Sequence, residues 1–218
     1  SKPLSPTSPC RMTMPSGFSR NEERSTRNST LSSSAEVRRT LRRLRPAERR
    51  TKLEYRDHSQ LPFIEQLGLV PKLMLDTTVY IDELQGRLPR DVEISLRATS
   101  VWHSTVTECE LSALAGLLAP DHPDSARVIE QVTKTIERRP SHRIVNPDRE
   151  TWCEAGVIAG LLARLQQYGK AEQRRILNDA LIFLSATKAG LAVLTRNVSD
   201  YDLLMQLVPQ GKAIFYDR

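Results

Sequence analysis

Residues 73–82 read Leu-Met-Leu-Asp-Thr-Thr-Val-Tyr-Ile-Asp: a short apolar run, an acidic residue where the run ends, and then the spacing of a helix. The same change from apolar run to helical spacing recurs down to the end of the chain. Strands that alternate with helices predict a parallel sheet with helices on both faces. In such sheets the ligand site lies beyond the carboxyl ends of the strands, where Asp76 directly follows the first run.

The expected elements fill residues 71–218, which we take as one domain. The strand candidates are Lys72–Leu75, Val101–Ser104, Arg143–Val145, Ala192–Thr195 and Ala213–Tyr216. The helix candidates are Val79–Leu84, Val106–Leu118, Ser125–Arg138, Arg149–Gln167, Ala171–Ala189 and Tyr201–Leu207. The predicted fold class is therefore α/β, with a five-stranded, mainly parallel sheet.

The residues before this domain have a different composition. Residues 1–34 are rich in Ser and Pro and poor in large apolar side chains, so we expect them to be disordered. Residues 1–50 are read as a solvated basic tail, with a possible short helix over residues 35–45 that carries Val37, Leu41 and Leu44 on one stripe. Residues 51–70 are read as a connector with a short helix near residues 61–67. The tail has alternative roles: it could contact nucleic acid or a partner, or serve as a transit peptide. A chain that begins near Thr51 is expected to fold.

The formal net charge of +6 over 218 residues is unevenly placed. Residues 1–57 hold 14 Lys and Arg against 6 Asp and Glu, whereas residues 58–218 hold 18 against 20. The basic character therefore belongs to the N-terminal part. A neutral to acidic domain argues against a nucleic-acid surface built on positive charge alone.

Cysteine spacing and hydropathy indicate the compartment. Cys10, Cys109 and Cys153 lie far apart without a CxxC pair, which argues against a disulfide framework or a zinc knuckle. No apolar run approaches the ~18 residues that span a bilayer, and no secretory signal is evident. We expect a soluble protein of the cytoplasm, without a membrane partner.

Four acidic residues are the candidates for chemistry: Asp76, Glu108, Asp179 and Asp200. Three of them follow strand candidates, and Asp179 lies within a helix. That helix descends about 16 Å from Asp179 to Gly190 at 1.5 Å per residue, and the next strand climbs back by about the same distance. Asp179 should therefore lie level with Asp200, so the four carboxylates can meet at one edge.

Each of these acids also has a structural reading. Asp76 can cap a helix, Thr105-x-x-Glu108 has the form of a capping box, and Asp200 suits the start of a helix. Asp179 resists such a reading because its helical neighbours are apolar, and a buried carboxylate needs a partner. Carboxylates gathered at one place favour Mg²⁺ or Mn²⁺, metals that support phosphodiester hydrolysis.

The remaining acidic residues are weaker candidates. Asp82 and Glu83 are expected on a solvated helix face, and Glu110 at the rim of the site or exposed to solvent. Asp202 is also placed on the surface, since Asp200 lies closer to the turn that ends the preceding strand. The four histidines share no ligand spacing, and no GxGxxG, Walker A or GxSxG motif is present.

At these residues the sequence resembles the PIN-domain ribonucleases, and in particular the VapC toxins of bacterial type II toxin–antitoxin pairs. The resemblance covers about residues 73–218. Its motifs are LDTTVYID (residues 75–82), STVTE (104–108), NDALI (178–182) and LTRNVSDY (194–201). Thr78 stands where the family often has Asn or Ser.

The resemblance implies a PIN-like three-layer α/β/α sandwich in which Asp76, Glu108, Asp179 and Asp200 bind Mg²⁺ or Mn²⁺, with Thr78 and Asn197 in support. It also implies an endoribonuclease that cleaves an RNA substrate, forms a homodimer and is inhibited by a cognate antitoxin protein.

Two other functions compete with this one. A phosphatase of the haloacid-dehalogenase kind also opens with a strand-borne Asp, but its chemistry needs a second acid two residues later, where Thr78 stands. A non-catalytic PIN-like nucleic-acid-binding or scaffold protein remains the alternative, although binding alone would not require all four acids.

Overall fold

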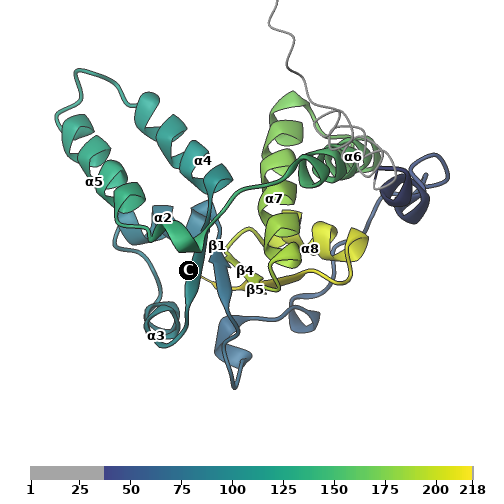
Figure 1. Cartoon of the computed structure of the whole chain (residues 1–218), viewed down its shortest axis with the longest axis horizontal. Coiled ribbons are helices and arrows are strands. Elements are labelled where there is room, and N and C mark those ends of the chain that lie inside the picture. The colour runs from purple at the N-terminus through teal and green to yellow at the C-terminus, as the bar shows by residue number, and fades with distance from the viewer. Residues whose placement is uncertain (1–36, 218) are drawn as a thin grey trace, which may run out of the picture.

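Five parallel strands form the centre of the protein (Figure 1). The structure, a computed structural model, describes residues 37–217, so the expectations for residues 1–36 lie outside it. The strands are β1 (Leu73–Leu75), β2 (Val101–Ser104), β3 (Ile144–Val145), β4 (Ala192–Thr195) and β5 (Lys212–Phe215). Their order is β3-β2-β1-β4-β5, with Leu75 opposite Leu194 at the centre of the sheet. Helical connections carry the chain back between parallel neighbours, as such pairing requires.

Helices cover both faces of this sheet. They are α2 (Thr77–Leu84), α3 (Arg90–Ala98), α4 (Thr105–Gly116), α5 (Ser125–Glu137), α6 (Arg149–Gln166), α7 (Lys170–Lys188) and α8 (Val198–Leu207). The predicted α/β fold class with a three-layer arrangement is confirmed. Helix α3 was not expected from the sequence. Within residues 37–217 no helix is both long and apolar enough to cross a membrane.

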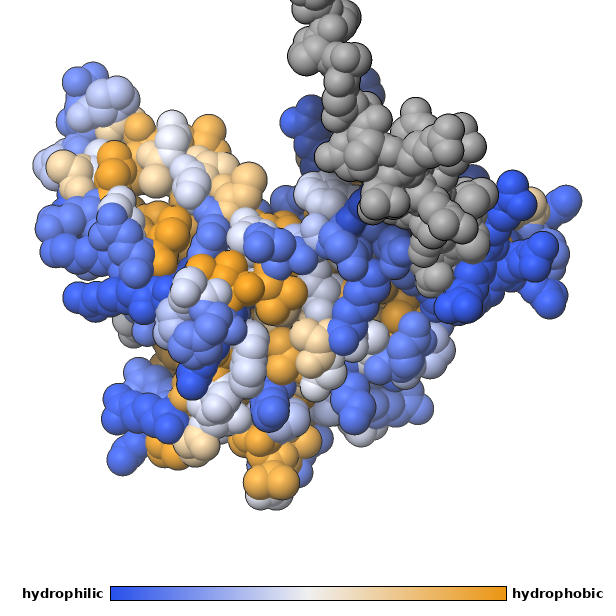
Figure 2. All heavy atoms as spheres, in the orientation of Figure 1, coloured by the Kyte–Doolittle hydropathy of each residue, from blue (hydrophilic) through white to orange (hydrophobic). Residues whose placement is uncertain are grey.

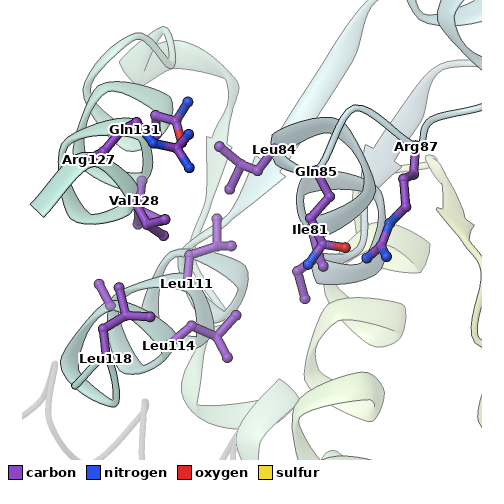
Figure 3. Close-up of a pocket in the computed structure, with 12 residues that line it drawn as sticks. Ile81, Leu84, Gln85, Arg87, Leu111, Leu114, Leu118, Arg127, Val128 and Gln131 are labelled. Carbon is purple, nitrogen blue, oxygen red and sulfur yellow. The ribbon is translucent and has the colours of Figure 1, made fainter. Parts of the chain in front are cut away.

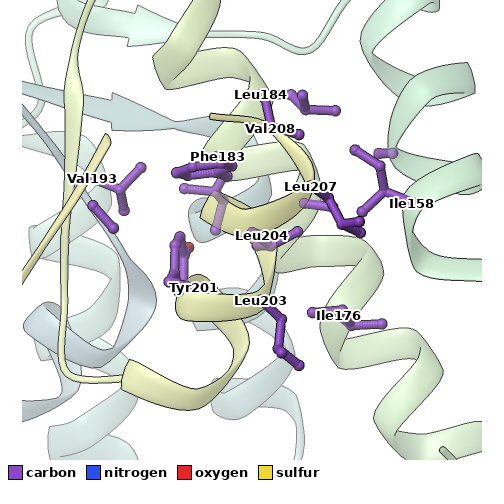
Figure 4. Close-up of a cluster of buried hydrophobic side chains, with 14 of the residues drawn as sticks. Ile158, Ile176, Phe183, Leu184, Val193, Tyr201, Leu203, Leu204, Leu207 and Val208 are labelled. Carbon is purple, nitrogen blue, oxygen red and sulfur yellow. The ribbon is translucent and has the colours of Figure 1, made fainter. Parts of the chain in front are cut away.

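Two apolar clusters hold the layers together. On one face, α6, α7 and α8 pack against the sheet through side chains such as Ile158, Ile176, Phe183 and Tyr201 (Figure 4). On the other face, α2, α3 and α5 contribute Val79, Val92 and Val132. Successive strand residues alternate between the clusters: Met74 belongs to the first, and its neighbours Leu73 and Leu75 belong to the second. Because both faces of β1 are buried, the strand is apolar throughout.

Helices α4 and α5 form an arm on one side of the molecule (Figure 1). Three large apolar side chains on this arm, Leu114, Leu117 and Ile129, are exposed. Figure 2 shows apolar side chains gathered over the same two helices.

The segment before β1 packs against the domain. Residues 37–44 are helical, and Leu44 is 0% exposed in the cluster that α6, α7 and α8 form. The Arg43 guanidinium donates to the carbonyl of Leu207 (3.0 Å) and also contacts Glu154. The sequence pattern suggested that the domain begins at residue 71. In the structure Leu44, at the end of the basic helix, is already part of the domain's core.

The same segment also reaches the edge of the sheet. Phe63 forms a parallel β-bridge with Phe215 of β5, and the amide of Phe215 donates to the carbonyl of Pro62 (2.9 Å). The helix expected near residues 61–67 is only a 3₁₀ turn over Ile64–Gln66, preceded by another over His58–Gln60. The segment thus lies beside the edge strand instead of running freely towards β1.

Candidate functional site

Asp76 lies at the carboxyl end of β1, in the middle of the sheet. Its Oδ2 accepts hydrogen bonds from the hydroxyls of Thr195 (2.7 Å) and Thr78 (2.8 Å), and its Oδ1 accepts from the Tyr201 hydroxyl (3.2 Å). It is also the N-cap of α2, with its Oδ2 accepting from the amide of Thr78. The capping reading is confirmed, and it leaves the carboxylate at the edge of the sheet where a ligand site is expected.

Asp179 and Asp200 meet through Asn197, as the height argument predicted. The Asn197 Nδ2 donates to Asp179 Oδ2 (3.1 Å) and to Asp200 Oδ2 (2.9 Å). Asn197 is itself the N-cap of α8, and its Oδ1 accepts from the amide of Asp200. The exposed guanidinium of Arg175 also forms an ion pair with Asp200 Oδ2 (3.0 Å). Thr78 and Asn197, expected as supporting residues, thus both contact site carboxylates.

The fourth carboxylate at this site is Glu110, and Glu108 points elsewhere. Glu110 accepts hydrogen bonds from the hydroxyl of Thr77 and from Asn178 Nδ2 (2.8 Å). Glu108 instead contacts Arg139 Nη1 (3.5 Å), whose guanidinium is buried against the ring of Tyr80. The structure therefore brings together Asp76, Asp179 and Asp200 from the predicted set, but not Glu108.

The directions in which side chains point around the axis of α4 explain why Glu110, and not Glu108, faces the site. Glu110 lies four residues after Val106, whose side chain belongs to the cluster shared with α7. Glu108 lies three residues before Leu111, which packs in the cluster on the other face of the sheet. The capping box expected from Thr105 is not formed either, because Ser104 is the N-cap of the helix. The signal missed in the sequence is the i, i+4 relation of Glu110 to an apolar residue on the α7 side.

Burial and mutual repulsion raise pKa values in this cluster. Burial, and then the charges of Asp76, Asp200 and Glu110, raise the pKa of Asp179 well above its ordinary value. Burial also raises the pKa of Glu110, against the hydrogen bonds from Thr77 and Asn178. Carboxylates in such a cluster must share protons, accept strong donors or bind a cation.

The donor set suits a hard divalent cation. All four carboxylates and the surrounding hydroxyl and amide groups offer oxygen, which Mg²⁺ and Mn²⁺ prefer. Asp200 Oδ1 is buried and has no hydrogen-bond partner, an orphan acceptor next to Asp179. In residues 37–217, no three Asp, Glu, His or Cys side chains are placed so that they could together hold a metal ion. Hydroxyls, Asn197 and Arg175 contact the carboxylate oxygens instead. The residues fit a cation chemically, and binding would replace some of these contacts.

Two other acids are buried, against expectation. Asp82, expected on a solvated face, is 0% exposed and accepts from the Arg196 guanidinium (2.7 Å) and the Tyr216 hydroxyl (2.9 Å). Asp202, also assigned to the surface, is 1% exposed and accepts from the amide (2.9 Å) and side chain (2.6 Å) of Arg56. The predicted exposure of both was wrong, because partners far away in sequence cover and neutralise them. Glu83 is exposed as expected.

A second surface feature is a groove of about 690 Å³ between α2, α4 and α5 (Figure 3). Four leucines line it: Leu84, Leu111, Leu114 and Leu118. Arg87, Arg127 and Gln131 stand at its polar border in the same view. The groove is apolar inside and charged at the rim, as protein-binding surfaces are.

Neither the family models nor the curated proteins compared with the chain gave a match. Solved structures do match, among them three toxin–antitoxin systems. VapBC2 from Rickettsia felis, bound to a promoter DNA fragment, has 13% identity and a TM-score of 0.46 over 67% of this chain and 99% of that one. DNA-bound VapBC from Salmonella typhimurium has 21% identity and a TM-score of 0.48 over 67% and 98%. VapBC-5 from Mycobacterium tuberculosis has 19% identity and a TM-score of 0.44 over 67% and 99%.

These complexes are what the chain is similar to. At such identities the likeness concerns the fold, and the partners named for those complexes do not transfer with it.

Proposed function

We propose that the protein is a metal-dependent endoribonuclease of the PIN-domain kind, which hydrolyses RNA phosphodiester bonds at the carboxyl edge of the sheet. The observation that carries this proposal is the meeting of Asp76, Glu110, Asp179 and Asp200, which come from four distant parts of the chain. Glu110 takes the place for which the sequence suggested Glu108. A purely structural cluster would not need so many acids at one buried place.

The residues around the site have separable tasks in this proposal. When bound, Mg²⁺ or Mn²⁺ would supply Lewis-acid stabilisation of the charge that develops on the phosphate oxygens. Thr78, Thr195 and Tyr201 hold the Asp76 carboxylate in one orientation, and Asn197 holds the other two aspartates in place. Such fixed donors reduce the reorganisation that a reaction would otherwise require.

Proton transfer falls to a carboxylate at the cluster. The pKa of Glu110 is raised by burial, which brings it nearer to neutral pH and makes the group a better base. Arg175 and Arg196 lie at the solvent edge of the acidic site and offer guanidinium donors for a phosphate of the RNA backbone. The protein itself needs no covalent nucleophile for this reaction.

The biological role in this proposal is that of a toxin held in check by a cognate antitoxin protein, with a homodimer as its working form in the cytoplasm. It rests on the resemblance of the four motifs. The apolar groove of Figure 3 suits a partner segment with apolar side chains, because an exposed groove of this kind marks an interaction surface more often than not.

The alternative is a non-catalytic PIN-like protein that binds nucleic acid or acts as a scaffold. One contact favours it: the Arg175 guanidinium already forms an ion pair with Asp200 (3.0 Å), and a bound cation would have to displace this charge partner. A protein that only binds RNA would keep its affinity in EDTA and would leave the RNA intact.

The test is cleavage of a structured RNA with Mg²⁺, with Mn²⁺ and with EDTA. Asp76→Asn and Asp179→Asn keep side-chain size but remove the charge that would hold the cation, so cleavage should fall by orders of magnitude with little loss of fold. Cleavage that survives EDTA, or that Asp76→Asn leaves undiminished, refutes the mechanism.

A matched pair of variants on α4 tests the exchange of glutamates. Glu110→Gln should lower cleavage by at least about 10²-fold, the usual scale for a general acid or base. Glu108→Gln changes the same charge two residues away and should leave the rate within a few-fold of wild type, as should Glu83→Gln on the exposed face of α2. Equal losses from the two α4 variants would remove Glu110 from the proposed machinery.

A further inference from the structure

Trp152 is a large apolar side chain left open to solvent next to the acidic site. It lies in the first turns of α6 and is 50% exposed. The side chain forms part of the wall of a cavity of about 220 Å³, which α4 and α7 complete. The chain has two tryptophans, and the other, Trp102, is partly buried on β2 between the side chains of Lys72 and Arg143. An indole exposed in a cavity wall is a common recognition surface, because its ring offers a flat apolar face.

The other walls of this cavity are uncharged, with Val106 and Pro147 as apolar members beside several polar groups. Asn146 and Asn178 contribute side-chain amides from the loop before α6 and from α7, and Cys109 and Thr105 contribute groups from α4. None of the described residues in the lining carries a formal charge. Such a lining does not suit a phosphate, which is bound by cations and backbone amides. It suits a neutral, planar group with donors and acceptors along its edge.

The cavity adjoins the carboxylates through Asn178. The Nδ2 of this residue donates to Glu110 Oε1 (2.8 Å), and the next residue in the chain is Asp179. With Nδ2 engaged, the carbonyl oxygen of the same amide is left as an acceptor for a ligand. A group held in the cavity would therefore lie one side chain away from the acids.

We propose that this cavity binds an unpaired nucleobase of the RNA next to the bond that is cleaved, with the base stacked on Trp152 and its edge facing Asn146 and Asn178. The inference rests on the proposed ribonuclease function and adds the substrate class: single-stranded RNA, or a loop whose bases are unstacked. Proteins that recognise such RNA stack its bases on aromatic side chains and read their edges with polar groups.

The first experiment uses the fluorescence of Trp152 in the full chain. Trp102→Phe leaves Trp152 as the only tryptophan, and Asp76→Asn prevents cleavage during the titration. A short single-stranded oligoribonucleotide should quench the emission, and Trp152→Ala should weaken its affinity, measured by anisotropy of a labelled strand, by about 5- to 150-fold. Trp152→Phe keeps an aromatic face and should restore most of that loss.

A second oligonucleotide separates the base from the backbone. A scan of abasic positions should find one position at which removal of the base weakens binding to the wild-type lining as much as Trp152→Ala does. At that position the abasic site and Trp152→Ala together should weaken binding no more than either change alone, because both remove the same stacking contact. Additive losses, or a scan with no such position, would overturn the proposal.

Cys109 gives an independent readout, since it is an exposed free thiol in the cavity lining. The oligonucleotide should slow its alkylation by N-ethylmaleimide, followed by mass spectrometry of the peptide that contains it. Unchanged alkylation at a saturating concentration of oligonucleotide would place the RNA elsewhere. Quenching by a second copy of the chain, but not by RNA, would make Trp152 a protein contact and would equally overturn the proposal.

Cleavage assays run in parallel keep the two proposals apart. A wild-type chain that cleaves RNA with Mg²⁺, together with a Trp152→Ala variant that binds and cleaves equally well, overturns only the base subsite. If RNA quenches the Trp152 emission and one abasic position weakens binding as much as Trp152→Ala does, but the chain cleaves no RNA, the result supports the base subsite and refutes the nuclease proposal.

Discussion

Replacing Leu44 by Ala tests whether the basic helix before the domain is part of its core. Leu44 is 0% exposed within the cluster of α6, α7 and α8, whereas Leu41, on the same helix, is 41% exposed. Removing a fully buried leucine side chain costs about 2–5 kcal/mol, because the transfer energy is lost and a cavity remains. The same change at a half-exposed position should cost well under about 1.5 kcal/mol, since less apolar surface returns to water.

The assay is urea and thermal unfolding of the full chain without added metal, followed by circular dichroism. For a protein of this size, ~1 kcal/mol shifts the thermal midpoint by about 2–4 °C, so Leu44→Ala should lower it by about 4–20 °C. Leu41→Ala serves as the matched control, with the same helix and the same atoms removed. Equal midpoints for the two variants would refute the packing of this helix on the domain.

Truncation gives the same contrast with a different perturbation. A chain that begins at residue 51 loses Leu44 together with the bond from Arg43 to the Leu207 carbonyl. It should unfold at a lower temperature than a chain that begins at residue 37. The polar composition of residues 1–50 alone predicts no such loss, because it marks the whole tail as dispensable for folding.

Three further outcomes follow from the buried acids and the groove. Because the pKa of Asp179 is raised in the folded state, its contribution to stability is full below its unfolded pKa of about 4 and is lost as pH rises through the folded pKa. The urea midpoint of the metal-free chain should therefore fall over this pH range, by about 1.4 kcal/mol of unfolding free energy per unit of pKa difference. Asp179→Asn should make this fall smaller. Asp202→Asn, which weakens the bonds to Arg56, should destabilise the fold by about 1–3 kcal/mol in thermal unfolding, whereas Glu83→Gln should stay within about 0.5 kcal/mol. Leu114→Glu in the groove should abolish dimer or antitoxin binding in light scattering and co-purification without altering RNA cleavage, whereas Leu117→Glu, exposed just after the end of the same helix and outside the groove, should not.

Three of the four site carboxylates could be placed from the sequence because a parallel sheet fixes heights. Strand and helix rise per residue put Asp179 level with the turn after β4, and Asn197 indeed bonds both Asp179 and Asp200. Height does not fix direction around a helix axis. Glu108 and Glu110 lie within one turn of α4, and only the position of α7 decides which of them faces the site.

The buried aspartates could not be placed because their partners come from far along the chain. Arg196 lies 114 residues after Asp82, and Arg56 lies 146 residues before Asp202. Asp residues are usually exposed unless paired, and nothing local in the sequence reveals such a pair. The packing of Leu44 was hidden because its stripe with Val37 and Leu41 is narrow and stands among arginines, and nothing local shows which of the three side chains reaches the core.

The bridge between Phe63 and Phe215 has a consequence for the order of folding during synthesis. Phe63 is synthesised 152 residues before Phe215, its bridge partner in β5. Contacts of such high sequence separation form late, since the intervening chain must be ordered first. Before this bridge forms, β5 lacks its neighbour and the upstream segment has no strand to pair with. The unpaired strand edges are then able to pair with other chains, which leads to aggregation. A chain stopped before Phe215 should therefore be recovered as insoluble or degraded material, even though every acidic residue of the site has already been synthesised.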